Sequence, residues 1–245
     1  MERRDRPAVA TFYADAALEA GAHVELDESA TQHAKARRVN AGDPIHVTNG
    51  RGAIAHGTLE RLTRGSALVS LETVNTVPMP PRLRLFVPVA DRERMLWLAE
   101  KSAELAVSEW QPVAFHRSAS VSPKGQGDAF MRKARARMVG AIEQSGGAWL
   151  PELCPERSLD DALVRANEVA AQRFLFERGG ESLVTKRPQA ADAMIGPEGG
   201  IEQEERMLIV DRHGWLPVSL GDTTLRFETA GVIAAGLLRG LMANA

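Results

Sequence analysis

The chain has 245 residues, 44% of them apolar, which is enough to bury the core of one large domain or two modest ones. No stretch approaches the roughly 20 apolar residues of a membrane span, and the charged residues 1–6 lead into no apolar leader, so we expect a cytoplasmic protein. The single cysteine, Cys154, cannot form an internal disulfide, and the six histidines lack ligand-like spacing, so we expect no metal ion.

The net charge of -2 hides an uneven distribution along the chain. Residues 82–140 hold 11 Lys and Arg against 6 Asp and Glu, whereas residues 141–245 hold 10 against 16. Solvated helix faces account for most individual charges. The distribution nevertheless permits a local surface that faces RNA.

Short strands and one helix are expected over residues 11–74. Asn49-Gly50 is a strong hairpin signal between two strand-like runs, and residues 63–66 form a second turn. The predicted strands are 23–26, 44–48, 53–62 and 67–71, with a helix over 27–39. A small β-barrel is the economical architecture for this domain.

A domain boundary is expected at residues 77–81, where three prolines in five residues exclude a helix or a central strand. From Arg82 to the end of the chain, strands and helices alternate, which predicts a mostly parallel sheet with helices on both faces. The predicted elements are strands at 83–87, 112–116, 173–177, 193–195 and 215–220, a helix through Met95, Leu98, Ser102 and Leu105, a capped helix start at 158–161, and helices at 202–213 and 228–242. The last helix is apolar almost all round, so it must be buried in the fold or against a partner subunit.

Two glycine-bearing turns, 195–200 and 220–230, each follow an apolar strand and precede a helix. Glycines at the ends of parallel strands let the backbone approach a ligand closely, and two such turns favour a nucleotide-like cofactor over ordinary strand-to-helix connections. Neither turn matches a Rossmann or a Walker phosphate motif.

The sequences IGPEGG at 195–200, LG at 220–221 and LRFETA at 225–230 closely resemble the signature of RsmE-type 16S rRNA (uracil-N3)-methyltransferases of the SPOUT, or α/β-knot, class. KSAELAV at 101–107, EQS at 143–145 and His33 with 37–39 match further family segments. Gly147, Ala148-Trp149, Ala106 and Phe227 depart from the family's usual residues. The resemblance spans nearly the whole chain.

The resemblance implies an N-terminal PUA-like β-barrel (1–77), and a C-terminal SPOUT domain (82–245) whose trefoil knot is an accepted exception to unknotted folding. It also implies a homodimer and a bent S-adenosylmethionine held by three knot loops. The implied cofactor-binding residues are Phe176, Glu177, Gly196, Pro197, Glu198, Gly199, Gly200, Leu220, Gly221, Leu225 and Arg226.

Methylation of uracil N3 requires loss of an imide proton, and the resulting negative charge spreads onto the base carbonyls. We expect Arg226 to stabilise that charge, with Glu198 or Glu228 orienting groups or accepting the proton. A structural ion pair between Arg226 and one of these glutamates is an equally good reading of the sequence.

The target base must be single-stranded or flipped out to reach the cofactor. Basic residues in both domains are candidates for contacts with the 16S rRNA, although a solubilising role fits each of them as well. These candidates are His33, Lys35, Arg37, Arg38, Lys124, Arg132 and Lys133. The alternatives that stay open are a SPOUT enzyme acting on tRNA or on a ribose 2′-oxygen, a noncatalytic RNA-binding protein of ribosome assembly and, least favoured, a metabolic enzyme using a nucleotide cofactor.

Overall fold

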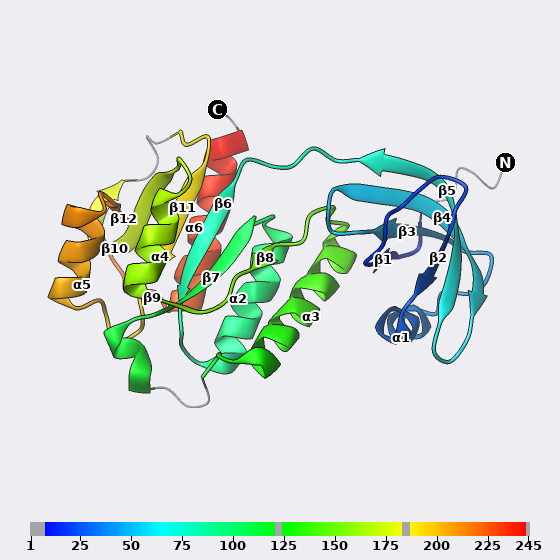
Figure 1. Cartoon of the computed structure of the whole chain (residues 1–245), viewed down its shortest axis with the longest axis horizontal. Helices are drawn as coiled ribbons and strands as arrows, with labels where there is room; N and C mark the ends of the chain where they lie inside the picture. Colours follow the sequence, from blue (N-terminus) through cyan, green and yellow to red (C-terminus); the bar gives the residue numbers. More distant parts are fainter. Residues whose placement is uncertain (1–7, 121–123, 183–186, 244–245) are drawn as a thin grey trace. The chain divides into compact units, whose positions relative to one another are not determined.

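The computed structural model describes residues 8–120, 124–182 and 187–243, so the charged residues 1–6 lie outside the described part. The chain divides into two compact units. Figure 1 labels their helices and strands. Unit 1 comprises residues 1–79 and 139–150, and unit 2 comprises residues 80–138 and 151–245. Residues 139–150, which the sequence places in the second domain, thus pack with the first unit.

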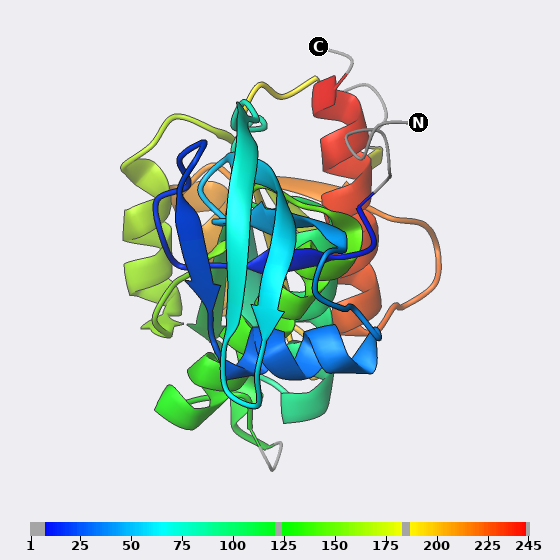
Figure 2. The same cartoon turned by 90° about the vertical axis from the view of Figure 1, so that its right-hand side faces the viewer.

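Unit 1 is built on a five-stranded sheet in the order β1-β3-β4-β5-β2. Its elements are β1 (Thr11–Tyr13), β2 (His23–Leu26), α1 (Glu28–Ala36), β3 (Pro44–Thr48), β4 (Ala53–Leu62) and β5 (Ala67–Thr76). The predicted hairpin joins β3 to β4, and β1, which the sequence did not indicate, pairs in parallel with β3. Figure 2 shows the long strands β4 and β5 with α1 at one end of them.

Helix α1 is shorter than the predicted 27–39, and its two ends have local causes. The Asp27 side chain accepts a hydrogen bond from the Ala30 N–H and begins the helix. Arg38 then takes a φ of +56°, a left-handed conformation that ends the helical path. Along the strands, alternate apolar residues point inward, and they form one core that includes Phe12, Val47 and Leu59.

Unit 2 is an α/β fold whose strand pairs are parallel, as the sequence predicts. The sheet order is β12-β10-β11-β6-β7-β8, with β9 also paired to β7. Its strands are β6 (Leu83–Pro88), β7 (Glu109–Ala114), β8 (Glu152–Leu153), β9 (Arg157–Ser158), β10 (Gln172–Ser182), β11 (Ala191–Ile195) and β12 (Leu216–Ser219). Strand β7 begins three residues before the predicted 112–116, because Trp110 and Gln111 are buried and pair with β6.

Helices cover both faces of this sheet (Figure 1). They are α2 (Arg92–Glu104), a 3-10 turn η2 (His116–Ser120), α3 (Asp128–Ser145), α4 (Leu159–Asn167), α5 (Gln203–Met207), a π-helical turn η3 (Leu208–Arg212) and α6 (Phe227–Ala243). Helices α2 and α6 pack together, and α6 packs on β6 and β11, whereas α4 packs beside β7. The predicted cap at Ser158 forms, and the predicted helix 202–213 is split into α5 and η3.

The sequence interpretation missed the long helix α3. It carries Arg and Lys at four of the six positions 132–137, so its apolar stripe is narrow and is limited to positions such as Phe130, Ala134, Met138 and Ile142, all of which are buried. The helix belongs to unit 2 up to Met138 and to unit 1 from Val139 onward.

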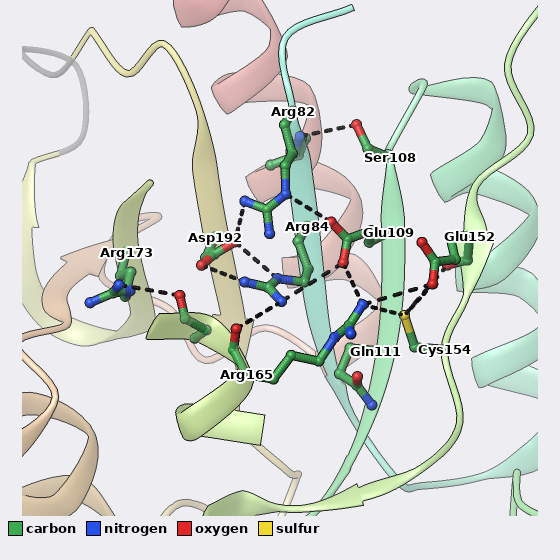
Figure 3. Close-up of polar contacts among 12 residues, drawn as sticks. Arg82, Arg84, Ser108, Glu109, Gln111, Glu152, Cys154, Arg165, Arg173 and Asp192 are labelled. Carbon is green, nitrogen blue, oxygen red and sulfur yellow. Dashed lines mark hydrogen bonds and ion pairs between the residues drawn. The ribbon is translucent and has the colours of Figure 1, made fainter. Parts of the chain in front are cut away.

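A buried ionic network crosses β11, β6 and β7 near the starts of these strands (Figure 3). Arg84 donates from Nε to Asp192 Oδ1 and from Nη2 to Oδ2, both at 3.1 Å, and neither side chain is more than 1% exposed. Arg82 Nε donates to Glu109 Oε1 at 2.8 Å, and Arg165 Nη2 donates to Glu109 Oε2 at 2.9 Å. Because Asp192, Arg84 and Glu109 are register partners on adjacent strands, the network opposes any slip of these strands.

No described helix is both long and apolar enough to cross a membrane. Within the same residues, no group of three or more His, Cys, Asp or Glu side chains could hold a metal ion.

Candidate functional site

A cavity of about 240 Å³ in unit 2 lies at the carboxyl ends of β10, β11 and β12. These three strands are adjacent and parallel, so the loops that follow them meet at one edge of the sheet. This is the edge at which open α/β folds bind small ligands. The lining residues are Phe176, Glu177, Arg178, Ile195, Gly196, Pro197, Gly200, Ile201, Arg206, Ser219, Leu220, Gly221, Thr223, Thr224, Leu225, Phe227 and Ala230.

Two glycine turns give the cavity its shape. The first is closed by a hydrogen bond from the Gly200 N–H to the Pro197 carbonyl at 2.8 Å, and Gly200 has a φ of +79°. A Cβ on Gly196 would lie 2.8 Å from Ile201 Cγ1, so a side chain there would crowd the cavity wall. In the second turn Gly221 has a φ of +132°, which strains any residue with a side chain.

A bulge in β10 forms the third side of the cavity. Both Phe176 and Glu181 pair with Val218 of β12, so the residues between them loop out of the sheet. Gly180 lies in this loop, and a Cβ on it would come within 2.6 Å of the Val218 nitrogen. The carboxylate of Glu177 is held by Arg206, whose Nη2 donates to Oε1 at 2.7 Å.

The structure brings eight of the predicted cofactor-binding residues to the cavity wall and leaves three outside it. Phe176, Glu177, Gly196, Pro197, Gly200, Leu220, Gly221 and Leu225 line the cavity. Glu198 and Gly199 belong to the first turn without lining the cavity, and Arg226 follows Leu225 with an exposed side chain. Threonines 223 and 224 add hydroxyl groups that the sequence reading had not singled out.

Arg226 forms no ion pair with Glu198 or Glu228 among the described residues. Both glutamates instead face Arg94, in the first turn of α2. Arg94 Nη1 donates to Glu198 Oε1, and its Nε lies 4.0 Å from Glu228 Oε1. Arg94 was missed because it is remote in sequence from both glycine turns, and no sequence signal would have found it.

Loop contacts also fix the first glycine turn from the other side. Arg117 Nη1 donates to the Gly199 carbonyl at 2.8 Å. The buried carboxylate of Glu205 accepts hydrogen bonds from the His116 N–H at 2.8 Å and from the Glu202 N–H at 3.0 Å. One buried acid therefore joins the loop after β7 to the segment that follows the turn.

The candidate RNA contacts divide between the two units. In unit 1, Lys35, Arg37 and Arg38 are exposed, and His33 is half-buried. In unit 2, Arg132 and Lys133 are exposed on α3, and Lys124 is half-buried beside Asp91, with which its backbone forms a bridge. The first group lies on one helix and its end, and the second on the loop before α3 and on α3 itself.

Glu143 organises the unit 1 group. Its carboxylate accepts from the Tyr13 N–H at 2.8 Å and contacts His33 Nδ1 at 2.9 Å. Arg37 Nε donates to His33 Nε2 at 2.8 Å, so Nε2 must be the unprotonated nitrogen and Nδ1–H donates to Glu143. These two hydrogen bonds hold Arg37 against α1. Glu143 of the EQS segment therefore has a structural role, which is to orient His33.

The family departures at residues 147–149 are explained by packing within unit 1. Trp149 covers Gly52 so closely that a Cβ there would lie 2.4 Å from Trp149 Cζ2. The indole Nε1 lies within hydrogen-bonding distance of the Val77 and Pro78 carbonyls, and the Gly147 carbonyl accepts from the Thr48 hydroxyl at 3.0 Å. This segment therefore anchors itself to the sheet of its own unit.

Known proteins resemble this chain over most of its length. The family model described as "RNA methyltransferase domain" matches residues 78–239. Ribosomal RNA small subunit methyltransferase E of Mycobacterium tuberculosis is 29% identical over 237 residues, covering 92% of this chain and 89% of the relative. The protein of the same name from Synechocystis is 26% identical over 222 residues, covering 84% and 68%.

Solved structures share the fold. A Legionella pneumophila structure, described as a methyltransferase in complex with the bound cofactor SAM, has a TM-score of 0.84 and 27% identity, covering 96% of this chain and 98% of the other. A ribosomal RNA small subunit methyltransferase E from Neisseria gonorrhoeae, bound to S-adenosyl methionine, has a TM-score of 0.84 at 24% identity, covering 95% and 98%.

Proposed function

The chain belongs to the RNA methyltransferase family, and on this premise we propose that it is an S-adenosylmethionine-dependent enzyme that methylates N3 of a uridine in 16S rRNA of the small ribosomal subunit. The observation that carries the proposal is the cavity built by two glycine turns and the β10 bulge at one edge of a parallel sheet. The relatives named small subunit methyltransferase E, and the Legionella structure with its bound cofactor, support the choice of substrate and methyl donor.

The cavity suits S-adenosylmethionine in its chemistry. Its walls combine apolar side chains from Ile195, Leu220 and Leu225 with the backbone of the two glycine turns, where no side chain blocks an approaching ligand. An adenine ring needs such walls together with backbone hydrogen bonds. When bound, this cofactor supplies an activated methyl group on a sulfonium.

The residues of the chain then have to place the uracil and handle its charge. Arg226 is exposed next to the cavity wall and is unpaired among the described residues, so its guanidinium can reach the carbonyl oxygens of a base that enters from solvent. Stabilisation of the charge on those oxygens lowers the barrier to methyl transfer. Glu198 and Glu228 are the candidate proton acceptors.

Finer features complete the proposal. After β11 the chain passes to β12, which pairs with β10 at the edge of the sheet. The loop that follows β12, at 220–226, lines the same cavity as the 196–200 turn. This arrangement supports the trefoil knot of the SPOUT class. The sheet of unit 1 is proposed as part of a PUA-like barrel that binds RNA. The expected cellular location is the cytoplasm.

We assign a homodimer on the basis of the apolar surface of α2 and α6. These two helices pack together, yet Trp97 of α2 and Ile233 and Leu237 of α6 stay exposed. Ile233 and Leu237 are four residues apart and therefore lie on one face of the helix. A second copy of the chain would cover this face.

The test is methylation of small ribosomal subunits that lack the modification, using purified protein and labelled S-adenosylmethionine. Digestion to nucleosides and mass spectrometry should show 3-methyluridine. Arg226→Ala should lower the single-turnover rate by about 100-fold, as for the loss of a group that stabilises transition-state charge. Arg212→Ala, which removes an exposed arginine that does not line the cavity, should leave the rate unchanged. Label in a ribose 2′-O-methyl nucleoside, or no transfer of label to the subunits, would refute the proposal.

A further inference from the structure

The point where the sheet changes direction lies beside the cavity. Strands β6 and β11 are adjacent and parallel, but the chain leaves β6 toward β7 on one side and leaves β11 toward β12 on the other. The two connections therefore diverge at the carboxyl ends of these strands, which is the position at which open α/β sheets bind ligands. The first turn of α2 follows β6 there, and the turn at 196–200 follows β11.

Three charged side chains meet where the two connections diverge. Arg94 comes from α2, Glu198 from the turn after β11, and Glu228 from the first turn of α6. The backbone of Arg94 is fixed because its N–H donates to the Asp91 side chain that caps α2, at 3.0 Å. The guanidinium therefore projects from an ordered helix start rather than from a mobile loop.

The two glutamates differ in the hydrogen bonding and exposure of their carboxylates. Glu198 makes the direct hydrogen bond to Arg94, and its side chain is 41% exposed. Glu228 is 12% exposed and lies 4.0 Å from Arg94 Nε through Oε1, while its Oε2 is buried with no hydrogen-bond partner among the described residues. Oε2 is therefore the carboxylate oxygen of this cluster that Arg94 leaves without a partner.

The charge of the cluster supports the same distinction. One guanidinium faces two carboxylates, so one negative charge stays uncompensated. A net negative group is suited to receiving a proton and unsuited to stabilising the anion of a deprotonated uracil. Arg94 thus cannot replace Arg226 as the cation for the base oxygens.

We infer that Arg94 is a positioning residue that separates the roles of the two glutamates: it holds Glu198 as its structural partner and leaves the Glu228 carboxylate as the proton acceptor. This inference rests on the proposed function. The N3–H bond of uracil breaks and its proton goes to the Glu228 carboxylate, giving a neutral carboxyl group. The electron pair left on N3 forms the new N–CH3 bond while the methyl–sulfur bond breaks, with its electrons remaining on sulfur.

The test is the single-turnover rate of 3-methyluridine formation between pH 5.5 and 9 as a function of variant. Wild-type protein should show a rate that is nearly independent of pH around neutrality, because a carboxylate of the protein, and not hydroxide, takes the proton. Glu228→Gln should lower the rate at pH 7 by about 100-fold, the usual effect of losing a general base. Its remaining rate should rise in proportion to hydroxide, because only uridine that is already ionised can react.

Changes to the positioning pair should give a different signature. Arg94→Ala and Glu198→Gln should each lower the rate by about tenfold, through misplacement of Glu228, and should keep the flat pH profile. Arg94→Lys should restore most of the rate. The control is Glu93→Gln, which removes one negative charge, as Glu198→Gln does, from an exposed residue next to Arg94 in α2. It should leave the rate unchanged.

Binding of S-adenosylmethionine, measured by calorimetry, checks that each variant keeps its cofactor site. The inference is overturned if Glu228→Gln keeps a fast, flat profile, or if Glu198→Gln acquires the hydroxide dependence instead. If Arg94→Ala does not fold, the rates and pH profiles of Arg94→Lys, Glu198→Gln and Glu228→Gln still test the inference. Failure of wild-type protein to form 3-methyluridine would refute the proposed function, whereas an active wild type with unaffected variants refutes only this inference.

Discussion

Removal of Asp192 should be among the most damaging single substitutions in unit 2. Its carboxylate is fully buried and accepts two hydrogen bonds from Arg84, whose side chain is 1% exposed, and it lies 3.3 Å from Arg82 Nη1. Asp192→Ala leaves the Arg84 guanidinium buried with only Glu109, at 3.7 Å, as a counter-ion. Loss of one partner from a buried pair costs about 3–5 kcal/mol, and the remaining Glu109 favours the lower end.

Urea unfolding followed by tryptophan fluorescence measures this cost, because Trp110 and Trp215 of unit 2 are buried and report its unfolding. The matched control is Arg137→Ala, which breaks a pair with Glu100 in which the arginine side chain is 56% exposed. That pair should contribute less than about 1 kcal/mol. Replacement of Arg84 and Asp192 together by leucine should recover much of the loss. Equal destabilisation by Asp192→Ala and Arg137→Ala would show that the network does not stabilise the sheet.

Four further outcomes are expected. Burial alone would raise the pKa of Glu109, but the guanidiniums of Arg82, Arg84 and Arg165 outweigh it and hold the pKa below its ordinary value. Glu109 therefore stabilises the fold above about pH 4.3 and loses this effect as the pH falls through its lowered pKa; Glu109→Gln should flatten the acid limb of stability against pH. Burial raises the pKa of Cys154 to about 11, so iodoacetamide at pH 8 should alkylate it only after unfolding. Ala106 takes a φ of +53°, a left-handed conformation that favours glycine, so Ala106→Gly should raise the free energy of unfolding by about 1 kcal/mol. Gly221→Ala should weaken S-adenosylmethionine binding by about tenfold in calorimetry, because a φ of +132° excludes a side chain.

Much of the fold of unit 2 follows from local sequence. The alternation of apolar strands and amphipathic segments after Arg82 predicts a parallel sheet covered by helices, because each period fits only one kind of element. The hairpin at Asn49-Gly50 and the cap at Ser158 also form as predicted, since both depend on neighbouring residues alone. The glycine turns identify the loops around the cavity for the same reason.

The tertiary structure decided what depends on residues distant in sequence. The sequence places residues 139–150 with the second domain, but packing joins them to unit 1, where Glu143 meets His33 and Trp149 covers Gly52. Arg94 lies 104 residues from Glu198, and no local pattern links the two. Strand order and helix packing determine which charged side chains meet. The sequence therefore identified both glutamates of the site, whereas Arg94 between them could be identified only from the fold.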